Sequence, residues 1–428
     1  MKNIFTYLVV GIVGSLWVTA CHPPEKKVGS SDLRVSRQAA EFEEQEAVWM
    51  IWPPEDHLAG FSNDAVALRI VEAVSPHQQV HVCANSAELL THAQSLVPDS
   101  LKPNISFHEV PAVEFWTRDM GPVFVEDMQG QKVMADFNFN VWGYADTTEE
   151  GAIIEEKFDE RIAGLMGIPM ISTDLVSEGG DREVNGKGTL MVVEEVEMGR
   201  NPHLSKEEIS AELSRMTGAT QVIWLKQGLK EDEHTFLGPI SLAGGAKAFT
   251  VLTTNGHIDE FARFVNDSTV LLAYVPEEDR EDPLARENHR RMEENYQILK
   301  GAADQDGEPL KIVRMPLPKT IIGEMRPGDP VYDIIRTLEY TQGDVFPVGE
   351  PVQVIAAASY LNFLITNKVV LGQKYWKEGM DTAIKSRDEE VKAILQQLFP
   401  TREVLMLDAL SVNYGGGGIH CITMQEPK

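Results

Sequence analysis

The chain has 428 residues, 43% of them hydrophobic, which is enough to bury the core of one large domain or of two or three smaller ones. Its 66 acidic residues outnumber its 38 basic ones, and the formal net charge is -28. Such a chain is not expected to bind nucleic acid or an anionic lipid surface, whereas it would attract a small cationic ligand. The same charge is also typical of proteins that are simply very soluble.

Residues 1–20 predict an export signal. An N-terminal lysine precedes an apolar run, residues 4–18, that is too short to span a membrane comfortably. The small residues directly before Cys21 resemble the lipobox of bacterial lipoproteins, which implies cleavage there, lipidation of the Cys21 sulfur and anchoring in the cell envelope. A plain signal peptide or an uncleaved anchor are the alternatives. Residues 21–38 would then form a flexible tether, and residues 39–428 a single folded domain.

Two cysteines remain beyond Cys21. Cys83 lies in an apolar, strand-like run, where a buried small hydrophobic residue is expected, and Cys421 lies close to the C-terminus. An exported protein with so few cysteines is not built on disulfides. No group of cysteines and histidines has metal-ligand spacing, so no metal and no organic cofactor is predicted.

From Phe42 onward, apolar patterns predict alternating strands and helices, which is typical of an α/β fold. The predicted strands are residues 47–52, 80–84, 105–110, 221–225, 311–315, 369–372 and 403–407, with further strands within 354–365. The predicted helices are residues 63–74, 86–96, 149–165, 282–299 and 381–398, and one that opens with the capping box Ser205–Glu208 and ends before Gly218. No linker divides the folded part, and no Rossmann or P-loop glycine pattern opens a helix.

Four consecutive glycines, residues 415–418, precede Cys421. Without Cβ atoms they let another group approach the backbone closely. The apolar alternation resumes at Ile419 and Ile422, which predicts a short strand that carries the cysteine. On a strand, His420 would point away from Cys421, so a base that activates the thiol must come from elsewhere in the chain. The alternative is that Cys421 is a buried packing residue.

Three polar stretches at predicted loops supply the groups that a reactive thiol needs. They are Glu114–Pro122 with Trp116 and Asp119, Ser177–Asp181 with Glu178, and Asn255–Phe264 with His257 and Asp259. Taken singly, each stretch also has a purely structural explanation. Arg118-Asp119 would be a surface ion pair, Glu178 a turn residue and His257 a helix cap. Taken together, a thiol, an imidazole, carboxylates and an indole suit a guanidinium, because paired carboxylates bind it bidentately and an indole stacks on it. A guanidinium held in this way presents its central carbon to a thiolate.

These stretches resemble the agmatine deiminase family, also called the Porphyromonas-type peptidylarginine deiminase family, of the guanidine-modifying superfamily. The likeness follows the same order along nearly the whole chain. It includes residues 42–53, 138–143, 199–202 and 358–363, and the segment Gly-Gly-Gly-Ile-His-Cys421-Ile-Thr. The resemblance implies the pentein fold, a five-bladed α/β propeller with pseudo-fivefold symmetry and its site on the axis.

The resemblance also implies a role for each candidate residue. Cys421 would be the nucleophile, His257 the general acid and base, Asp119 and Asp259 the guanidinium-binding carboxylates, and Glu178 the carboxylate beside the histidine. Trp116 matches a tryptophan three residues before the first aspartate. Trp116 and Gly417, the latter in the glycine run, are expected to contact the substrate.

The implied activity is that of a guanidine hydrolase in putrescine biosynthesis. Agmatine, the favoured substrate, would give N-carbamoylputrescine and ammonia through a covalent thiouronium on Cys421, with no metal or cofactor. The partner is therefore a small cationic guanidine.

Three departures from the family pattern concern the distal end of the substrate. Glu114 stands where aspartate is usual, Asp181-Arg182 follow the second stretch where a small polar and an apolar residue are usual, and roughly twenty extra residues, 235–255, precede His257. Arg182 is the best-placed partner for a substrate carboxylate, so a peptidylarginine or free-arginine deiminase is the alternative enzyme. A non-catalytic lipoprotein that binds polyamines or arginine is the alternative from another class.

Overall fold

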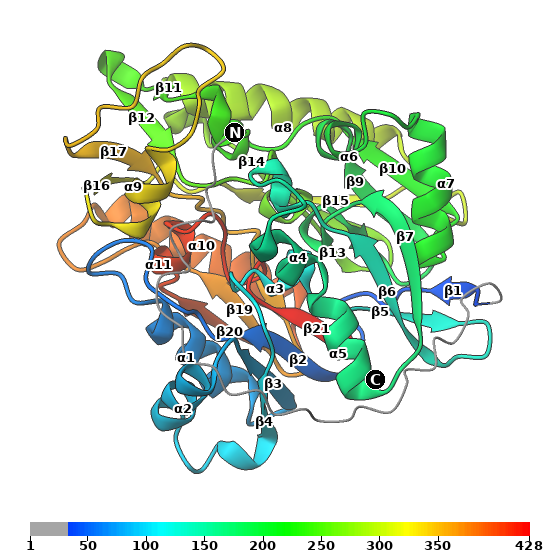
Figure 1. Cartoon of the computed structure of the whole chain (residues 1–428). Coiled ribbons are helices and arrows are strands. Elements are labelled where there is room, and N and C mark those ends of the chain that lie inside the picture. The colour runs from blue at the N-terminus through cyan, green and yellow to red at the C-terminus, as the bar shows by residue number, and fades with distance from the viewer. Residues whose placement is uncertain (1–32) are drawn as a thin grey trace.

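The computed structural model describes residues 33–428, so the predicted export signal and lipidated Cys21 lie outside the described part. The described chain is a mixed α/β structure. Its sheets of three or four strands surround a central region, and helices such as α1 (Asn63–Val74), α7 (Lys206–Thr217) and α8 (Pro283–Gly301) lie at the periphery (Figure 1). None of the helices within residues 33–428 combines the length and the apolar character that a membrane crossing requires.

Five of the six sheets in residues 33–428 share one pairing pattern. Two strands pair antiparallel, and a third strand pairs parallel with the second after a helical connection. Parallel neighbours need such a crossover, and α-helices normally form it.

Three of these units occupy the middle of the chain. The first unit comprises β5 (Val123–Asp127), β6 (Lys132–Asn138), α4 (Glu150–Glu156), α5 (Phe158–Met166) and β7 (Met170–Val176). The second comprises β8 (Glu183–Val184), β9 (Thr189–Val193), α6 (Glu194–Arg200), α7 (Lys206–Thr217) and β10 (Gln221–Leu225). The third comprises β13 (Ala262–Asn266), β14 (Thr269–Tyr274), α8 (Pro283–Gly301) and β15 (Lys311–Pro316).

The last two units complete the pattern, and the fifth joins both ends of the described chain. The fourth unit comprises β18 (Leu364–Ile365), β19 (Val369–Gln373), α10 (Thr382–Leu398) and β20 (Glu403–Leu407). The fifth comprises β21 (Met424–Pro427), β2 (Gln45–Ile51), α1 (Asn63–Val74), β3 (Gln79–Ala84), α2 (Ala87–Leu96) and β4 (Ile105–Glu109). Its first strand is thus the last strand of the chain.

The sixth sheet lies outside this pattern, at the upper left of Figure 1. Its strands are β11 (Ile240–Ser241), β12 (Lys247–Thr250), β17 (Val352–Ile355) and β16 (Ile322–Met325), and α9 (Pro330–Ile335) packs beside them. It is built from the extra residues 235–255 and from the Pro- and Gly-rich region between β15 and β17. These segments share a small hydrophobic cluster around Phe249, Tyr332 and Phe346, so they form one structural unit.

Most predicted elements are confirmed. α1, β10 and β20 have the predicted bounds, and the predicted capping box at Ser205 opens α7, which ends at Gly218 with a left-handed φ of 73°. Cys83 is buried, at 1% exposed, in the larger hydrophobic cluster.

Three structural predictions need correction. The helix predicted over residues 149–165 is broken at Lys157 into α4 and α5, and Glu155 and Phe158 on either side of the break are both buried. The folded part begins before residue 39, because β1 (Val35–Arg37) pairs with β5. Residues 419–422 form a turn, and β21 begins only at Met424, because Thr423 donates from its backbone N–H to His420 and from its hydroxyl to Ile419.

Candidate active site

Each repeated unit has a short segment directly before its first strand, and the predicted site residues lie in or near four of these five segments. These segments are α3 (Thr117–Met120), η5 (Gly179–Asp181), η9 (Ile258–Glu260), residues 358–363, and the turn at residues 419–422. Because the units share one pairing pattern, these positions are structurally equivalent. The fold therefore collects residues from five distant parts of the sequence.

Hydrogen bonds join these five segments into a closed ring. Going round the ring, the bonds are Gly180 N to Asp119 Oδ1 (2.9 Å), Ile258 N to Asp181 Oδ1 (3.2 Å), Asn362 Nδ2 to Glu260 Oε1 (2.9 Å), His420 N to Asn362 Oδ1 (2.9 Å) and Arg118 N to the Cys421 carbonyl (2.9 Å). Each segment is thus fixed by both of its neighbours.

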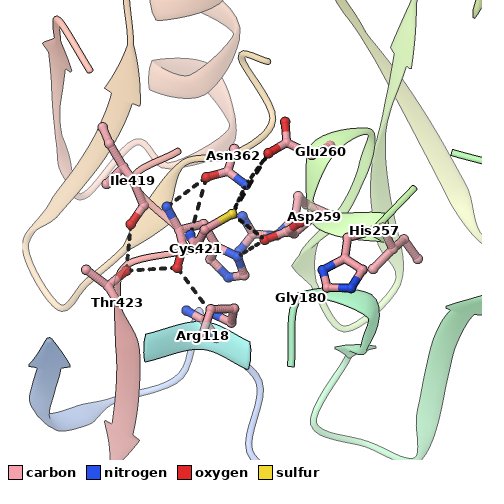
Figure 2. A network of polar contacts seen from close by, with 12 residues as sticks. Arg118, Gly180, His257, Asp259, Glu260, Asn362, Ile419, Cys421 and Thr423 are labelled. Atoms are coloured by element: carbon pink, nitrogen blue, oxygen red, sulfur yellow. Dashed lines mark hydrogen bonds and ion pairs between the residues drawn. The ribbon is translucent and has the colours of Figure 1, made fainter. Parts of the chain in front are cut away.

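Cys421 lies in the middle of a buried polar network (Figure 2). Its Sγ is 3.6 Å from Oδ2 of Asp259 and 3.9 Å from Oε1 of Glu260, and it accepts a hydrogen bond from Nδ2 of Asn362 at 3.0 Å. Burial raises the pKa of the thiol well above its ordinary value, and the neighbouring carboxylates raise it further. At neutral pH the resting cysteine is therefore a thiol.

The Asn362 side chain can adopt only one amide orientation. Its Oδ1 accepts from the backbone N–H of His420, so its Nδ2 must face Glu260 and Cys421. Gly418 packs against this amide, because a Cβ built on Gly418 would lie 2.5 Å from Asn362 Oδ1. The amide therefore presents an N–H to the sulfur, which favours the thiolate once it forms.

His420 belongs to this network, contrary to the prediction that it points away from Cys421, because both side chains meet Oδ2 of Asp259. Its Nδ1 lies 2.7 Å from Oδ2 of Asp259, and its Nε2 lies 2.8 Å from Oε2 of Glu41. Glu41 is also paired with Arg263 at 2.6 Å. Although burial alone would raise the pKa of Asp259, the hydrogen bond and charge of His420 lower it. Asp259 is thus held as a carboxylate beside the sulfur.

His257 lies between two carboxylates. Its Nδ1 is 3.6 Å from Oδ1 of Asp119, and its Nε2 is 3.5 Å from Oε2 of Glu178. Burial alone would lower the pKa of His257, but these carboxylates and Asp181 raise it to about 10. Glu178 is fixed in turn by Arg200 at 2.6 Å, and although burial opposes ionisation, Arg200 and His257 lower the pKa of Glu178 to about 2. His257 therefore rests as an imidazolium.

Asp119 and Asp259 lie on either side of Gly180. A Cβ built on Gly180 would lie 2.8 Å from Oδ1 of Asp119, 3.4 Å from Oδ2 of Asp259 and 2.6 Å from Nδ1 of His257. Only a glycine allows these groups to approach so closely. Oδ2 of Asp119 accepts a bond of 2.8 Å from the indole N–H of Trp142. Val141 and Trp142 have φ values of 54° and 53°, a strained conformation of the kind that persists at functional sites.

A pocket leads from the surface to Cys421. Its lining comprises His57, Glu114, Trp116, Asp119, Val141, Trp142, Tyr144, Leu252, Thr253, Thr254, Val331, Ile334, Gly415, Gly416 and Cys421. The predicted contact residue Trp116 is in this lining. Gly417 lies between Trp116 and Cys421, because a Cβ on it would approach both side chains to within 2.9 Å.

Arg182 does not line this pocket, so the prediction that it contacts the substrate needs correction. The side chain is buried, with its guanidinium 3.7 Å above the centre of the Phe137 ring. Its Nη1 donates to the carbonyl and hydroxyl of Ser177. Since the Ser177 and Phe137 contacts occupy the guanidinium inside the protein, Arg182 supports the turn that carries Glu178.

Sequence reasoning assigned no role to Glu41, Glu260, Asn362, His420 or Trp142. Asn362 and Trp142 stand in stretches that carry the family resemblance, but nothing local indicates their partners. One sequence signal was available for the pair Glu41 and Arg263. Arg263 stands in the apolar run Phe-Ala-Arg-Phe, and a charge buried in such a run requires a buried counter-charge.

The ligand atoms of Asp259, Glu260 and Cys421 all lie within 4.8 Å of one another, which is metal-ligand spacing. Asp119 and Trp116 line the pocket that reaches Cys421, and Asp259 lies 3.6 Å from the sulfur. Together these groups suit a planar cation that binds through several N–H groups. Placed there, such a cation would be held between carboxylates with its central atom open to the sulfur.

Comparison with known proteins agrees with this chemistry. The sequence model of the family described as Porphyromonas-type peptidyl-arginine deiminase matches residues 37–237 and 240–427. The agmatine deiminase of Pseudomonas aeruginosa is 31% identical over 401 residues, covering 91% of this chain and 95% of that protein. The agmatine deiminase of Pseudomonas fluorescens is 32% identical over 401 residues, covering 91% and 94%. A solved structure of the Enterococcus faecalis agmatine deiminase, described as catalysing its reaction, superposes with a TM-score of 0.70 at 28% identity, covering 92% of this chain and 96% of that one.

Proposed function

The chain belongs to the Porphyromonas-type peptidyl-arginine deiminase family, and from this membership and the site we infer that it is an agmatine deiminase. It hydrolyses the C–N bond of a small guanidine, converting agmatine to N-carbamoylputrescine and ammonia. The groups in front of Cys421 suit the guanidinium end that agmatine presents.

The charge of the pocket is the observation that supports agmatine as the substrate. Among its described lining residues there is no lysine or arginine, and the carboxylic acids are Glu114 and Asp119. Burial lowers the pKa of the lining His57 to about 4, so this ring is neutral. Agmatine, with two cationic ends, suits such a pocket. The α-carboxylate of arginine would lack a basic partner, because Arg182 is engaged elsewhere.

The resting site holds its protons on the thiol of Cys421 and on the imidazolium of His257. We propose that the bound guanidinium changes this state, because a cation between Asp119 and Asp259 offsets the carboxylate charge that disfavours the thiolate, so that the thiol releases its proton to solvent. Asn362 stabilises the thiolate by hydrogen bonding. The substrate thus favours formation of its own nucleophile.

Catalysis then proceeds in two halves. The thiolate forms an S–C bond to the central carbon, and His257 gives its proton to the departing nitrogen as the C–N bond breaks, which releases ammonia and leaves an S-alkylthiouronium. Neutral His257 next takes a proton from water, and the resulting hydroxide attacks the same carbon. The C–S bond breaks, which yields the ureido product and regenerates Cys421. The overall reaction consumes one water and one guanidinium and yields one ureido group and one ammonium ion.

We further propose that the five repeated units are the blades of a five-bladed propeller with a pseudo-fivefold axis. The shared pairing pattern of five sheets and the closed ring of the segments that precede them support this arrangement. A site on such an axis receives one loop from each blade.

The proposed function is tested by measuring ureido product from agmatine, arginine, and peptides with internal or C-terminal arginine. We expect turnover of agmatine and little of the others. Cys421→Ala should abolish turnover while substrate binding persists. Preferred turnover of arginine or of an arginine peptide would overturn the substrate assignment.

A further inference from the structure

We propose that Glu114 binds the distal ammonium group of the substrate, so that the site selects short guanidines that carry a second cation. This inference rests on the proposed function and names the residue responsible for its specificity. It depends on the position of Glu114 in the pocket lining, on the acids around it and on the mainly apolar walls of the pocket.

Glu114 and Asp119 are the acids in the described pocket lining, and they have different neighbours. Asp119 belongs to the group around Cys421, where it faces His257 and Trp142. Glu114 lies in the segment between β4 and α3 and is half-buried. Apart from these two acids, the pocket walls are mainly aromatic and aliphatic, with Trp116, Val141 and Leu252 among them. A flexible alkyl chain suits such walls, and Glu114 is the group that its charged end can meet.

The backbone of Glu114 is held in place by a second acid. Oε1 of Glu155 accepts the backbone N–H groups of Val113 and Glu114, at 2.7 and 2.6 Å. Glu155 is 1% exposed, and its Oε2 has no hydrogen-bond partner. A buried carboxylate oxygen without a partner is costly, so Glu155 is a second acid beside Glu114 whose charged form burial disfavours.

No ion pair within residues 33–428 compensates this acidic group. Glu155 and Glu55 both act on Glu114, and none of the three acids forms a salt bridge within the described part of the chain, although the charge of Arg161 acts on Glu155. Burial raises the pKa of Glu114 to about 8, with further contributions from Glu155 and Glu55, and burial raises the pKa of Glu155 to about 7. A cation beside Glu114 would supply the missing counter-charge and favour its ionised form.

The far wall of the pocket comes from the sixth sheet and its connections. Leu252, Thr253 and Thr254 follow β12, and Val331 and Ile334 belong to α9. These residues derive from the two regions that the repeated units do not include. Leu252, Val331 and Ile334 give this wall apolar side chains, which leaves Glu114 as the acid of the lining that lies outside the group around Cys421.

The test compares two substrates on one variant. Pentylguanidine has the guanidinium and nearly the length of agmatine, but a methyl group replaces the ammonium. Glu114→Gln removes the charge with little change of shape. We expect kcat/KM for agmatine to fall roughly 10- to 100-fold, as is typical for loss of a charge-assisted pair, and kcat/KM for pentylguanidine to change less than about twofold. The wild type should prefer agmatine by a similar factor, and Glu114→Gln should remove this preference.

Two control variants separate local recognition from general electrostatics. Glu55→Gln removes a charge from the same acidic group without touching the pocket lining, and Glu109→Gln removes an exposed acid at the end of β4. Both should keep the preference for agmatine. Equal loss for both substrates in Glu114→Gln, or a wild type that does not distinguish them, would overturn this inference. A wild type that turns over neither substrate would instead overturn the proposed function.

Discussion

The thiol of Cys421 faces Asp259 and Glu260, and a cysteine in such surroundings keeps its proton without a bound cation. The ordinary pKa of a cysteine is about 8.5, and both burial and the carboxylates raise that of Cys421 well above its usual range. The resting protein should therefore react poorly with neutral electrophiles. A cationic electrophile that occupies the guanidinium position should react much faster.

Alkylation of Cys421 tests this property. With neutral iodoacetamide we expect slow modification at pH 7, with a rate that still rises beyond pH 9. Chloroacetamidine carries a planar cation like that of a guanidine, and at pH 7 it should react at least about tenfold faster, after correction for the rate of each reagent with free cysteine. Cys421→Ala identifies the modified residue. An iodoacetamide profile with a midpoint below pH 8 would contradict the resting thiol.

The pH profile of turnover tests the charge of His257. The imidazolium must donate a proton to the leaving nitrogen, and its pKa is raised to about 10, so kcat should fall only as the pH rises through that value. Glu178→Gln removes one of the carboxylates that raise this pKa, so the alkaline limb should move about one pH unit lower. Exposed Glu207→Gln is the control. An unmoved limb in Glu178→Gln would show that Glu178 does not set the charge of His257.

At the scale of single residues, sequence motifs predicted the site residues that stand in recognisable stretches. They did not predict the residues whose partners lie far away in the sequence. Asp119, Glu178, His257, Asp259 and Cys421 were predicted, and the structure brings them to one ring of contacts. Glu41 and His420 could not be paired from sequence, because 379 positions separate them. His420 was misplaced because strand alternation was applied to a segment that forms a turn.

At the scale of elements, the turn at residues 419–422, which carries Cys421, can pack closely only because the glycine run precedes it. A Cβ on Gly418 would lie 2.4 Å from Nε2 of Gln373 and 2.5 Å from Oδ1 of Asn362, within the network that orients the thiol. At Gly164 in α5, by contrast, an added Cβ would have no atom within 4 Å, and the φ of Gly164 is not left-handed.

Gly418→Ala should lower stability by about 1 to 3 kcal/mol through overpacking and reduce kcat at least about 100-fold by displacing Asn362 from the sulfur. Gly164→Ala should leave kcat unchanged and raise stability by about 0.5 to 1 kcal/mol, because alanine favours a helix interior. Chemical denaturation and steady-state kinetics measure both effects. Wild-type kcat in Gly418→Ala would show that the turn tolerates a side chain and that the glycine run has another purpose.

Elements with strong local signals were predicted with their bounds. α1 and α7 have side-chain caps at Ser62 and Ser205, and β10 and β20 are runs of apolar residues between helices. The two-residue strands β8 and β18 have no such signal, because their pairing with β9 and β19 defines them. The break at Lys157 was equally hidden, since the helical periodicity continues through it.

At the scale of the whole molecule, the fivefold pattern is absent from the sequence because the units share backbone pairing and not side chains. The resemblance to a family was the only route from the sequence to the propeller that we propose. The sixth sheet was indicated only as extra length near residues 235–255, and its association with α9 became evident in the folded structure.

The proposed anchoring at Cys21 is also a property of the whole molecule. We expect Cys21→Ala to abolish attachment of lipid in a bacterial host while agmatine turnover stays within about twofold of wild type, because the ring of site residues lies entirely within residues 118–421. Intact mass and membrane fractionation provide the measurement. Wild-type protein that carries no lipid mass on Cys21 and remains fully in the soluble fraction would refute the lipobox prediction.

The pairing of β21 with β2 has a consequence for when the protein becomes active during its synthesis. β2 and the segments with Asp119, Glu178 and His257 are all translated before Cys421. The segment with Cys421 and the strand that pairs with β2 follow them along the chain. A nascent chain therefore cannot hydrolyse a guanidine, however much of it has folded. For the same reason, a stop codon between Cys421 and β21 would leave a protein in which Cys421 has lost its anchor.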